Sequence, residues 1–372
     1  MLKNISIIDF HKQYLNGEYQ VICYGAGRRA NEIPDRLGSK EILEHIAFFV
    51  DQKQQPNVEI AGHQYEIRTM EYANMYAQEK RCVVLITNMY FLEILDMFKE
   101  NTVFDDVDIV SLELITCLEI EKRAVKSYLP DNLRIDKRQQ IPQIIHYCWF
   151  GDKPLSEKHI AWMQSWKKHC PGYEIVEWNE SNYDVNKNQY MAEAYSVKKW
   201  GFVSDYARLD IIYNNGGIYL DTDVELIKNI DDMLYQNAFM CFETNYVVNS
   251  GLGFGARAKD ALIKKCMDSY NNVKFIDENG NMDLTPCTIR QTKVLIEEGL
   301  IPNGTYQRIG GMTIYPQKVM SGQSYALGVP ILAPYTRAIH HFEASWKSEE
   351  ENQKRARLQK FLNENLMQDY EL

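Results

Sequence analysis

The chain has 372 residues, of which 45% are hydrophobic and 25% are charged. These are ordinary values for a globular protein, and the length predicts two domains. Acidic residues outnumber basic ones, 51 to 41, and the net charge of −10 without a basic run argues against nucleic-acid binding.

The first third of the chain alternates between short apolar runs and helical patterns. The apolar runs predict strands over residues 19–24, 46–50, 81–87 and 107–112. Helices are expected over residues 28–37 and 91–99. Because strands that alternate with helices form parallel sheets, residues 1–120 are expected to fold as a Rossmann-like α/β domain.

A glycine-rich turn follows the first expected strand. Gly25, Gly27 and Ala30 fit the pattern G-x-G-x-x-A, and Asp51 ends the next strand. In Rossmann domains this arrangement binds a dinucleotide, because the glycines let a diphosphate approach a helix N-terminus. Pro34 falls inside the short helix that follows, and such domains also serve as scaffolds that bind no cofactor. The sequence leaves nucleotide binding open here.

A charged segment over residues 121–140 is expected to be a linker or a connecting helix. A second α/β domain is expected over residues 141–346. Its strands are expected in residues 141–151, 173–178, 218–220 and 239–243, and its helices in residues 156–168, 258–270 and 289–298. Residues 347–372 are expected to contain a polar C-terminal helix.

Residues 200–225 are the most informative part of the chain. The pattern predicts a helix that stops at Gly216-Gly217 and is followed by a short buried strand. The strand ends in Asp221 and Asp223, and side chains alternate along a strand, so both carboxylates are expected on the same side.

Two carboxylates this close raise each other's pKa unless a cation or an arginine compensates. A hard divalent cation, Mg²⁺ or Mn²⁺, is the natural partner, and it usually bridges to a substrate diphosphate. A solvated turn that happens to contain two Asp residues is the plain alternative. The preceding helix favours the metal site, because Asp205 and Arg208 are three residues apart and share one face.

Three blocks of sequence resemble the glycosyltransferases of family 32, which carry a D-x-D motif. The group includes initiating α-1,6-mannosyltransferases and bacterial capsule and lipopolysaccharide transferases, and it is similar to the catalytic domains of clostridial glucosylating toxins. The opening block is IPQIIHYCWFG at residues 141–151, and the central block is the stretch around D-T-D. The closing block is HHFEASW at residues 340–346. The resemblance implies a GT-A-type domain over residues 141–346.

The resemblance also implies roles for individual residues. Trp149 matches the tryptophan that stacks on the base of the donor. Asp205 and Arg208 match the pair that holds the donor sugar and its diphosphate. Asp221 matches the aspartate that reaches the ribose and the sugar, and Asp223 matches the direct metal ligand.

The closing block supplies the remaining expected contacts. His341 matches a C-terminal histidine that completes the metal shell, whereas His340 alternates to the other side and is expected to be structural. Ser345 and Trp346 match positions that close over the diphosphate.

The expected function is metal-dependent transfer of a sugar from a nucleotide sugar, with UDP favoured over GDP by analogy. The resemblance implies retention of the anomeric configuration, a glycan or lipid-linked acceptor, and a role in surface polysaccharide synthesis. Two alternatives stay open. One is a nucleotide-sugar oxidoreductase or epimerase that uses the N-terminal domain, and the other is a catalytically dead scaffold that binds glycans.

The cysteines and the apolar runs bear on the compartment. None of the eight cysteines forms a C-x-x-C pair, which argues against a zinc or redox motif. The first 19 residues lack the apolar core of a signal peptide, and no apolar run approaches the length of a membrane span. A cytoplasmic location is therefore expected, while peripheral membrane contact and oligomer formation are left open.

Overall fold

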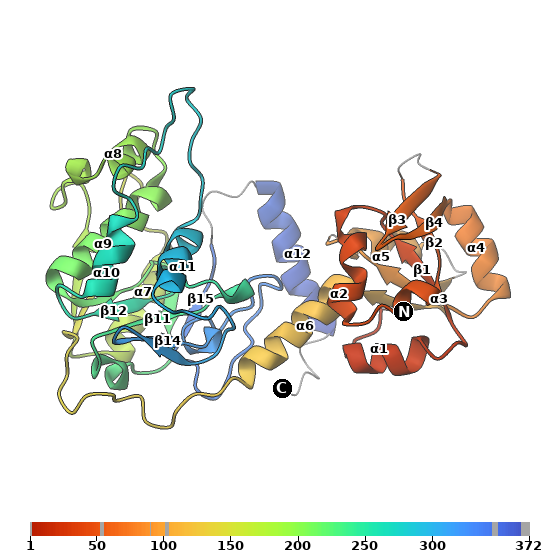
Figure 1. Cartoon of the computed structure of the whole chain (residues 1–372), viewed down its shortest axis with the longest axis horizontal. Coiled ribbons are helices and arrows are strands. Elements are labelled where there is room, and N and C mark those ends of the chain that lie inside the picture. The colour runs from red at the N-terminus through yellow and green to blue at the C-terminus, as the bar shows by residue number, and fades with distance from the viewer. Residues whose placement is uncertain (1, 53–55, 90, 101–103, 344–348, 366–372) are drawn as a thin grey trace. The chain divides into compact units, whose positions relative to one another are not determined.

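The computed structural model describes residues 2–52, 56–89, 91–100, 104–343 and 349–365 (Figure 1). The chain divides into two compact units. The first comprises Met1–Arg123 together with Glu349–Leu372, and the second comprises Ala124–Ser348. The division falls within the segment expected as a linker. It also assigns the C-terminal helix to the first unit, whereas the sequence suggested a separate tail.

The first unit contains a six-stranded sheet with the order β3-β4-β2-β1-β5-β6. Strands β4, β2, β1, β5 and β6 are parallel, and β3 pairs with β4 in the antiparallel direction. The strands are β1 Gln20–Tyr24, β2 Ile46–Val50, β3 Asn57–Ile60, β4 His63–Arg68, β5 Cys82–Ile86 and β6 Asp108–Ser111. The parallel α/β architecture is confirmed. The hairpin of β3 and β4 was not expected, because its alternating polar residues resemble a loop.

Each helix of the first unit buries at least one side chain. They are α1 Ile7–Tyr14, α2 Ile33–Leu37, α3 Ile42–His45, α4 Met70–Glu79, α5 Phe91–Lys99, α6 Leu112–Val125 and α12 Glu349–Asn365. The C-terminal helix α12 packs Phe361 edge-on against Phe91 of α5, with ring centroids 6.3 Å apart. The helix expected over residues 28–37 is split into a 3₁₀ turn, Arg28–Glu32, and α2. Pro34 lies in the first turn of α2, the position where a proline fits.

The glycine-rich turn of the first unit is closed by its own side chains. The Asp51 carboxylate accepts a hydrogen bond from the Ala26 amide at 2.6 Å. Gly25 has φ +104°, and a Cβ there would lie 2.9 Å from Thr87 Oγ1. The Asp51 carboxylate of the dinucleotide pattern thus already satisfies one amide of the turn. Nucleotide binding by this unit stays a prediction.

The second unit is built on a seven-stranded sheet with the order β13-β14-β11-β12-β9-β7-β8. Neighbours β9, β7 and β8 are parallel, as are β11 and β14, and β12 runs antiparallel between β9 and β11. These strands are β7 Ile144–Cys148, β8 Glu174–Trp178, β9 Gly217–Tyr219, β11 Ala238–Cys241, β12 Phe254–Ala256, β13 Gln307–Ile309 and β14 Met312–Tyr315. A separate antiparallel ribbon joins β10, Val224–Leu226, to β15, Ala338–His340.

Helices cover the second sheet. They are α7 Glu157–His169, α8 Gln189–Ser196, α9 Trp200–Asn215, α10 Ala261–Asp268 and α11 Cys287–Glu297, and α8 to α11 lie side by side (Figure 1). Alternate residues of β11 enter different cores. Ala238 and Met240 join the cluster under α8 to α11, whereas Phe239 and Cys241 join the cluster that contains Trp166 of α7. This alternation confirms that the sheet is buried on both faces.

A buried histidine ties the end of α9 to the sheet. Gly216 has φ +68° and Gly217 has φ +99°, so the chain turns sharply from the helix into β9. His146 Nε2 lies 3.0 Å from the Gly216 carbonyl oxygen, and Trp178 Nε1 donates to His146 Nδ1 at 3.0 Å. A Cβ on Gly217 would lie 2.9 Å from His146 Nε2. The turn therefore needs glycine, and it directs β9 toward Asp221.

None of the described helices combines the length and the apolar character that a bilayer crossing requires. All eight cysteines carry free thiols, and seven of them are buried.

Candidate functional site

Three charged side chains from α9 and the end of β9 form a chain of ion pairs. Arg208 Nη2 lies 3.2 Å from Asp205 Oδ1 and 3.4 Å from Asp221 Oδ1. The guanidinium also lies over the ring of Tyr219, 4.9 Å from its centroid, and the Tyr219 hydroxyl donates to Asp221 at 3.0 Å. Asp205 and Arg208 thus share one helix face, as the spacing predicted, and that face is directed at Asp221.

Burial sets the electrostatics of this group. It raises the pKa of the Asp205 and Asp221 carboxyls, and the Arg208 guanidinium partly offsets the effect. Burial is the largest single effect on Arg208 and disfavours its charged form, but Asp221, Tyr219 and Asp205 together outweigh it and raise the pKa of Arg208 well above its usual value. A permanently charged, 4% exposed arginine therefore stands beside the first aspartate of the D-x-D motif.

The second aspartate of the motif is paired with a histidine from the last strand of the unit. Strands β10 and β15 pair with Val224 opposite His340. His340 Nε2 lies 3.1 Å from Asp223 Oδ1, and the amide of Glu343 donates to Asp223 Oδ2 at 3.0 Å. Burial alone would raise the pKa of Asp223 and lower that of His340. Their mutual attraction overcomes burial with the help of the Glu343 amide on Asp223 and of the Asp221 and Glu243 charges near His340, so the pKa of Asp223 is lowered and that of His340 is raised.

Helix α7 holds the ribbon that carries this pair. Trp166 is fully buried, and its Nε1 donates to the Val224 carbonyl at 2.8 Å. The neighbouring Ser165 hydroxyl accepts from the Leu226 amide at 2.8 Å. These two hydrogen bonds hold β10 just after the D-x-D motif, which limits how far Asp223 can move.

Asp221, Asp223 and His340 could together hold a divalent cation. Each offers one ligand atom, and the three atoms lie within 4.8 Å of one another. His340 Nδ1 is buried without a hydrogen-bond partner among the described residues, so this ring is held from one side only. Two carboxylates and an imidazole are a donor set that suits Mn²⁺, and the carboxylates suit Mg²⁺. The residues present therefore fit such an ion.

Of the two adjacent histidines, His340 and not His341 lies beside the aspartates, the reverse of the arrangement that the sequence suggested. His341 was expected at the metal, but its ring stacks on Trp162, with centroids 4.2 Å apart and planes 14° apart. Its Nε2 lies 2.9 Å from Glu225 Oε2. His340 is the last residue of β15 and pairs opposite Val224, so its side chain reaches the aspartates, whereas the side chain of His341, the next residue, is directed to Trp162.

Gly251 lies against the site, at a position where the sequence left open either a plain turn or a segment facing the reacting sugar. A Cβ on Gly251 would lie 2.4 Å from Asp221 Oδ2 and 3.1 Å from Arg208 Nη1. The Gly251 amide donates to Asn249 Oδ1 at 2.6 Å. The close approach explains why a residue without a side chain stands here.

A thiol also reaches the site from a distant helix. Cys287, the first residue of α11, forms a side-chain hydrogen bond with Asp205. The Asp205 carboxylate raises the pKa of this thiol further, beyond the effect of burial. The two residues are far apart in the chain, and no local pattern in the sequence announces their contact.

Trp149 lies at the end of β7 and begins a row of rings. Its indole is partly buried, and Nε1 donates to the Lys153 carbonyl at 2.7 Å. Its ring lies 5.3 Å from His159, and that ring lies 5.6 Å from Trp162, the residue stacked on His341. The structure therefore places Trp149 at the strand end that the sequence suggested. Its contact with a base stays a prediction.

The last part of the closing block cannot be placed. Ser345 and Trp346, expected over the diphosphate, lie outside the described residues. Glu343, the last residue before that gap, has Oε2 3.1 Å from His159 Nε2. The closing block is thus anchored to α7 up to this point.

Comparison with known families identifies the region that carries the motif. Residues 156–240 match the family described as a glycosyltransferase sugar-binding region containing a DXD motif. The matched region includes Asp205, Arg208, Asp221 and Asp223. The resemblance noted in the sequence is therefore confirmed for this part of the chain.

Curated relatives match over parts of their length. The chain is similar to inositol phosphoceramide mannosyltransferases 1 and 3 of Schizosaccharomyces pombe. It is 25% identical to the first over 37% of this chain and 44% of that protein, and 31% identical to the second over 27% and 29%. It is 26% identical to the Subversion of eukaryotic traffic protein A of Legionella pneumophila, over 26% of this chain and 19% of that protein. The chain thus spans less than half the length of each of these relatives.

Among solved structures, the PaToxG glycosyltransferase is similar at 17% identity and a TM-score of 0.36. The match covers 50% of this chain and 77% of that one. A likeness of this degree carries no argument about the fold.

Proposed function

We propose that this chain, whose residues 156–240 match the DXD-containing glycosyltransferase region, transfers a sugar from a nucleotide sugar to a hydroxyl group. The observation that carries the proposal is the cluster of Asp221, Asp223 and His340 beside the buried Arg208. Acidic metal ligands beside the buried guanidinium of Arg208 suit a nucleotide sugar. Its diphosphate can bind both a metal ion and an arginine, and its sugar carries hydroxyl groups.

In this proposal Asp223, Asp221 and His340 hold Mn²⁺ or Mg²⁺. A bound divalent ion would supply positive charge near the departing diphosphate. The geometry supports the assignment, since His340 Nε2 lies 3.1 Å from Asp223 Oδ1 and the three ligand atoms lie within 4.8 Å of one another. Tyr219, whose hydroxyl donates to Asp221, would hold that carboxylate in position for the ion.

The other residues of the site bind and orient the donor. Arg208 would contact the diphosphate, and Asp205 would accept hydrogen bonds from hydroxyls of the donor sugar. Trp149 would stack on the base, with a UDP-sugar as the favoured donor. We propose transfer with retention of configuration and assign no covalent nucleophile, so the departing diphosphate itself would accept the proton of the acceptor.

The second unit would then be a GT-A-type domain, and its acceptor a glycan or a lipid-linked hydroxyl. Two relatives are named as mannosyltransferases of inositol phosphoceramide, which supports a hexosyl donor and an acceptor of this kind. A role in surface polysaccharide synthesis belongs to the same proposal.

The test is hydrolysis of UDP-sugars with and without Mn²⁺, measured as UDP release. Asp223→Asn should lower metal-dependent turnover on the order of a hundredfold or more, since the amide cannot replace the charge at the metal. Asp131→Asn, at an exposed position, is the matched control and should behave as the wild type. Near wild-type turnover of Asp223→Asn at saturating Mn²⁺ would overturn the proposal.

A thermal-shift screen would identify the donor. A nucleotide sugar that binds only the folded state raises the unfolding temperature by mass action, by an amount set by its concentration relative to Kd. The shift is expected with Mn²⁺ present and should be lost in Asp223→Asn. A donor that stabilises both proteins equally would argue against this site.

A further inference from the structure

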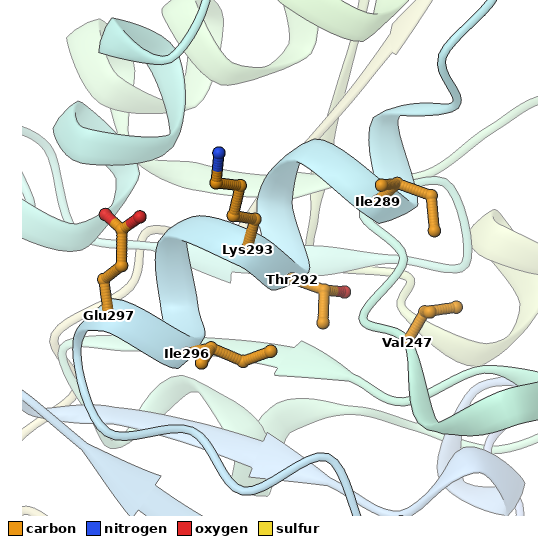
Figure 2. Close-up of a pocket in the computed structure, with 6 residues that line it drawn as sticks. All are labelled: Val247, Ile289, Thr292, Lys293, Ile296 and Glu297. Atoms are coloured by element: carbon orange, nitrogen blue, oxygen red, sulfur yellow. The ribbon is translucent and has the colours of Figure 1, made fainter.

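A pocket opens beside α11, away from the cluster of acidic residues. It encloses about 330 Å³ and is lined by Val247, Ile289, Thr292, Lys293, Ile296 and Glu297 (Figure 2). Figure 2 shows the charged ends of Lys293 and Glu297 directed away from Val247. The side-chain atoms that line the pocket are almost entirely aliphatic. The volume lies at the lower end of the roughly 300–1,000 Å³ typical of sites for small molecules.

The apolar lining is exposed although it belongs to a well-packed helix. Ile289 is 50% exposed and Ile296 is 46% exposed, while Gln291 and Leu295 on the inner side are fully buried. A single exposed isoleucine needs no explanation, but two on one helix face that meet a valine from another segment form a patch. Helix α11 thus presents one face to the core and a second apolar face to solvent.

The same helix connects this pocket to the candidate active site. At its first residue, Cys287 forms a hydrogen bond with Asp205. Farther along, Gln291 donates to the Ser250 hydroxyl at 2.9 Å, and Ser250 directly precedes Gly251, the residue against Asp221.

The loop after β11 also runs past both the apolar pocket and the acidic cluster. The Val248 amide donates to Thr292 Oγ1 at 2.8 Å, so Val247 is held against α11 at the pocket. Gly251, four residues later, touches Asp221. One helix and one loop therefore run from the acidic cluster to the apolar pocket without interruption.

We propose that this pocket binds the aliphatic part of an amphiphilic acceptor, a molecule with a hydroxyl-bearing head and an alkyl chain. The inference rests on the proposed function, because it assigns the acceptor of that reaction. The head would lie near Gly251 and the N-terminus of α11. The chain would follow the helix past Ile289 to Ile296, roughly 13 Å from Cys287 at about 1.5 Å per residue.

The size of the patch favours a small molecule over a second protein. Three apolar side chains supply far less than the roughly 1,000 Å² of buried area that a stable protein interface needs. An alkyl chain, in contrast, gains affinity with each methylene group that leaves water, and it needs only a narrow apolar surface.

The experiment compares octyl and methyl β-D-glucopyranoside, both below the micelle concentration, by calorimetric titration of the full chain. Octyl glucoside should bind about tenfold or more tightly than methyl glucoside, because only its chain reaches the pocket. Ile289→Gln and Ile296→Gln should each remove most of that preference. Ile120→Gln, which changes an isoleucine of comparable 41% exposure in the other unit, should keep it.

Three outcomes would overturn the inference. The first is equal affinity for the two glucosides, and the second is an octyl preference that Ile289→Gln and Ile296→Gln leave intact. The third is sedimentation that shows a dimer of the wild type dissociated by these same variants, since a second copy would then cover the patch. Circular dichroism and the unfolding temperature verify that each variant is folded.

Donor hydrolysis with Mn²⁺ separates this inference from the proposed function. Ile289→Gln and Ile296→Gln should hydrolyse UDP-sugars at the wild-type rate while losing the octyl preference. If the wild type hydrolyses the donor but shows no chain-length preference, only the acceptor site is refuted. If hydrolysis is absent or independent of Asp223, the proposed function fails first.

Discussion

The buried His146 should make the second unit lose stability in mild acid. Both ring nitrogens are occupied in the neutral form, since Trp178 Nε1 donates to Nδ1 and Nε2 donates to the Gly216 carbonyl. A proton on Nδ1 would face the Trp178 donor. Burial lowers the pKa of His146 to about 4, with a smaller opposing effect of the Gly216 carbonyl. The perturbation is therefore a change of pH from 7 to 5.

The sign and size follow from proton linkage. The pKa of His146 in the folded state lies below the value of about 6.5 in the unfolded chain, so protons bind the unfolded state more tightly. Its stabilising effect is fully present above pH 6.5 and is lost as the pH falls toward 4. The two pKa values give a loss of about 2 kcal/mol between pH 7 and pH 5, and about 3 kcal/mol once the pH falls below 4.

Urea unfolding of the wild type and of His146→Gln, each at pH 7 and pH 5, measures this effect. A glutamine can accept from Trp178 and donate to Gly216, but it does not titrate. All six tryptophans belong to the second unit, so their fluorescence follows that unit alone. The difference in free energy of unfolding between the two proteins should shift by about 2 kcal/mol in favour of the variant at pH 5. An equal difference at both pH values would refute the reasoning.

The remaining predictions concern the candidate active site. His340→Ala should weaken Mn²⁺ binding about tenfold or more, while His341→Ala should leave it nearly unchanged; calorimetry with Mn²⁺ checks this, and equal losses would contradict the assignment. Gly251→Ala should push the Asp221 carboxylate aside and lower donor turnover on the order of a hundredfold with little change in unfolding temperature; turnover close to wild type would count against it. Trp149→Ala should raise the donor KM more than it lowers kcat, and steady-state kinetics that show an unchanged KM would remove the residue from the base site.

Much of the fold could be read from local patterns. The strands β1, β2, β5 and β8 and the helices α5, α7 and α11 lie within one or two residues of their expected positions. Continuous apolar runs and periodic helices carry their own signal, because each buries a face in any arrangement. The short strands β10, β12 and β15 were missed, since three residues show no periodicity and gain their structure from their neighbours.

The site was determined by sequence only where its geometry is local. The spacing of Asp205 and Arg208 within one helix face follows from the period of a helix. Asp221 and Asp223 also lie close together, but β9 ends at Tyr219 and residues 222–223 form a turn, so this turn and not the strand period brings them together. Hence the proximity of Asp205 and Arg208 could be anticipated, whereas the ion pair of Arg208 with Asp221 could not.

Tertiary structure alone decided which side chains complete the site. The choice of His340 over His341 depends on the register between β10 and β15, and a shift of one residue would reverse it. The contacts of Gly251 with Asp221 and of Cys287 with Asp205 join segments that meet only after the sheet and α11 have packed. Local sequence sets which face a residue can occupy, whereas the contacts between distant segments are set by the register and packing of the whole unit.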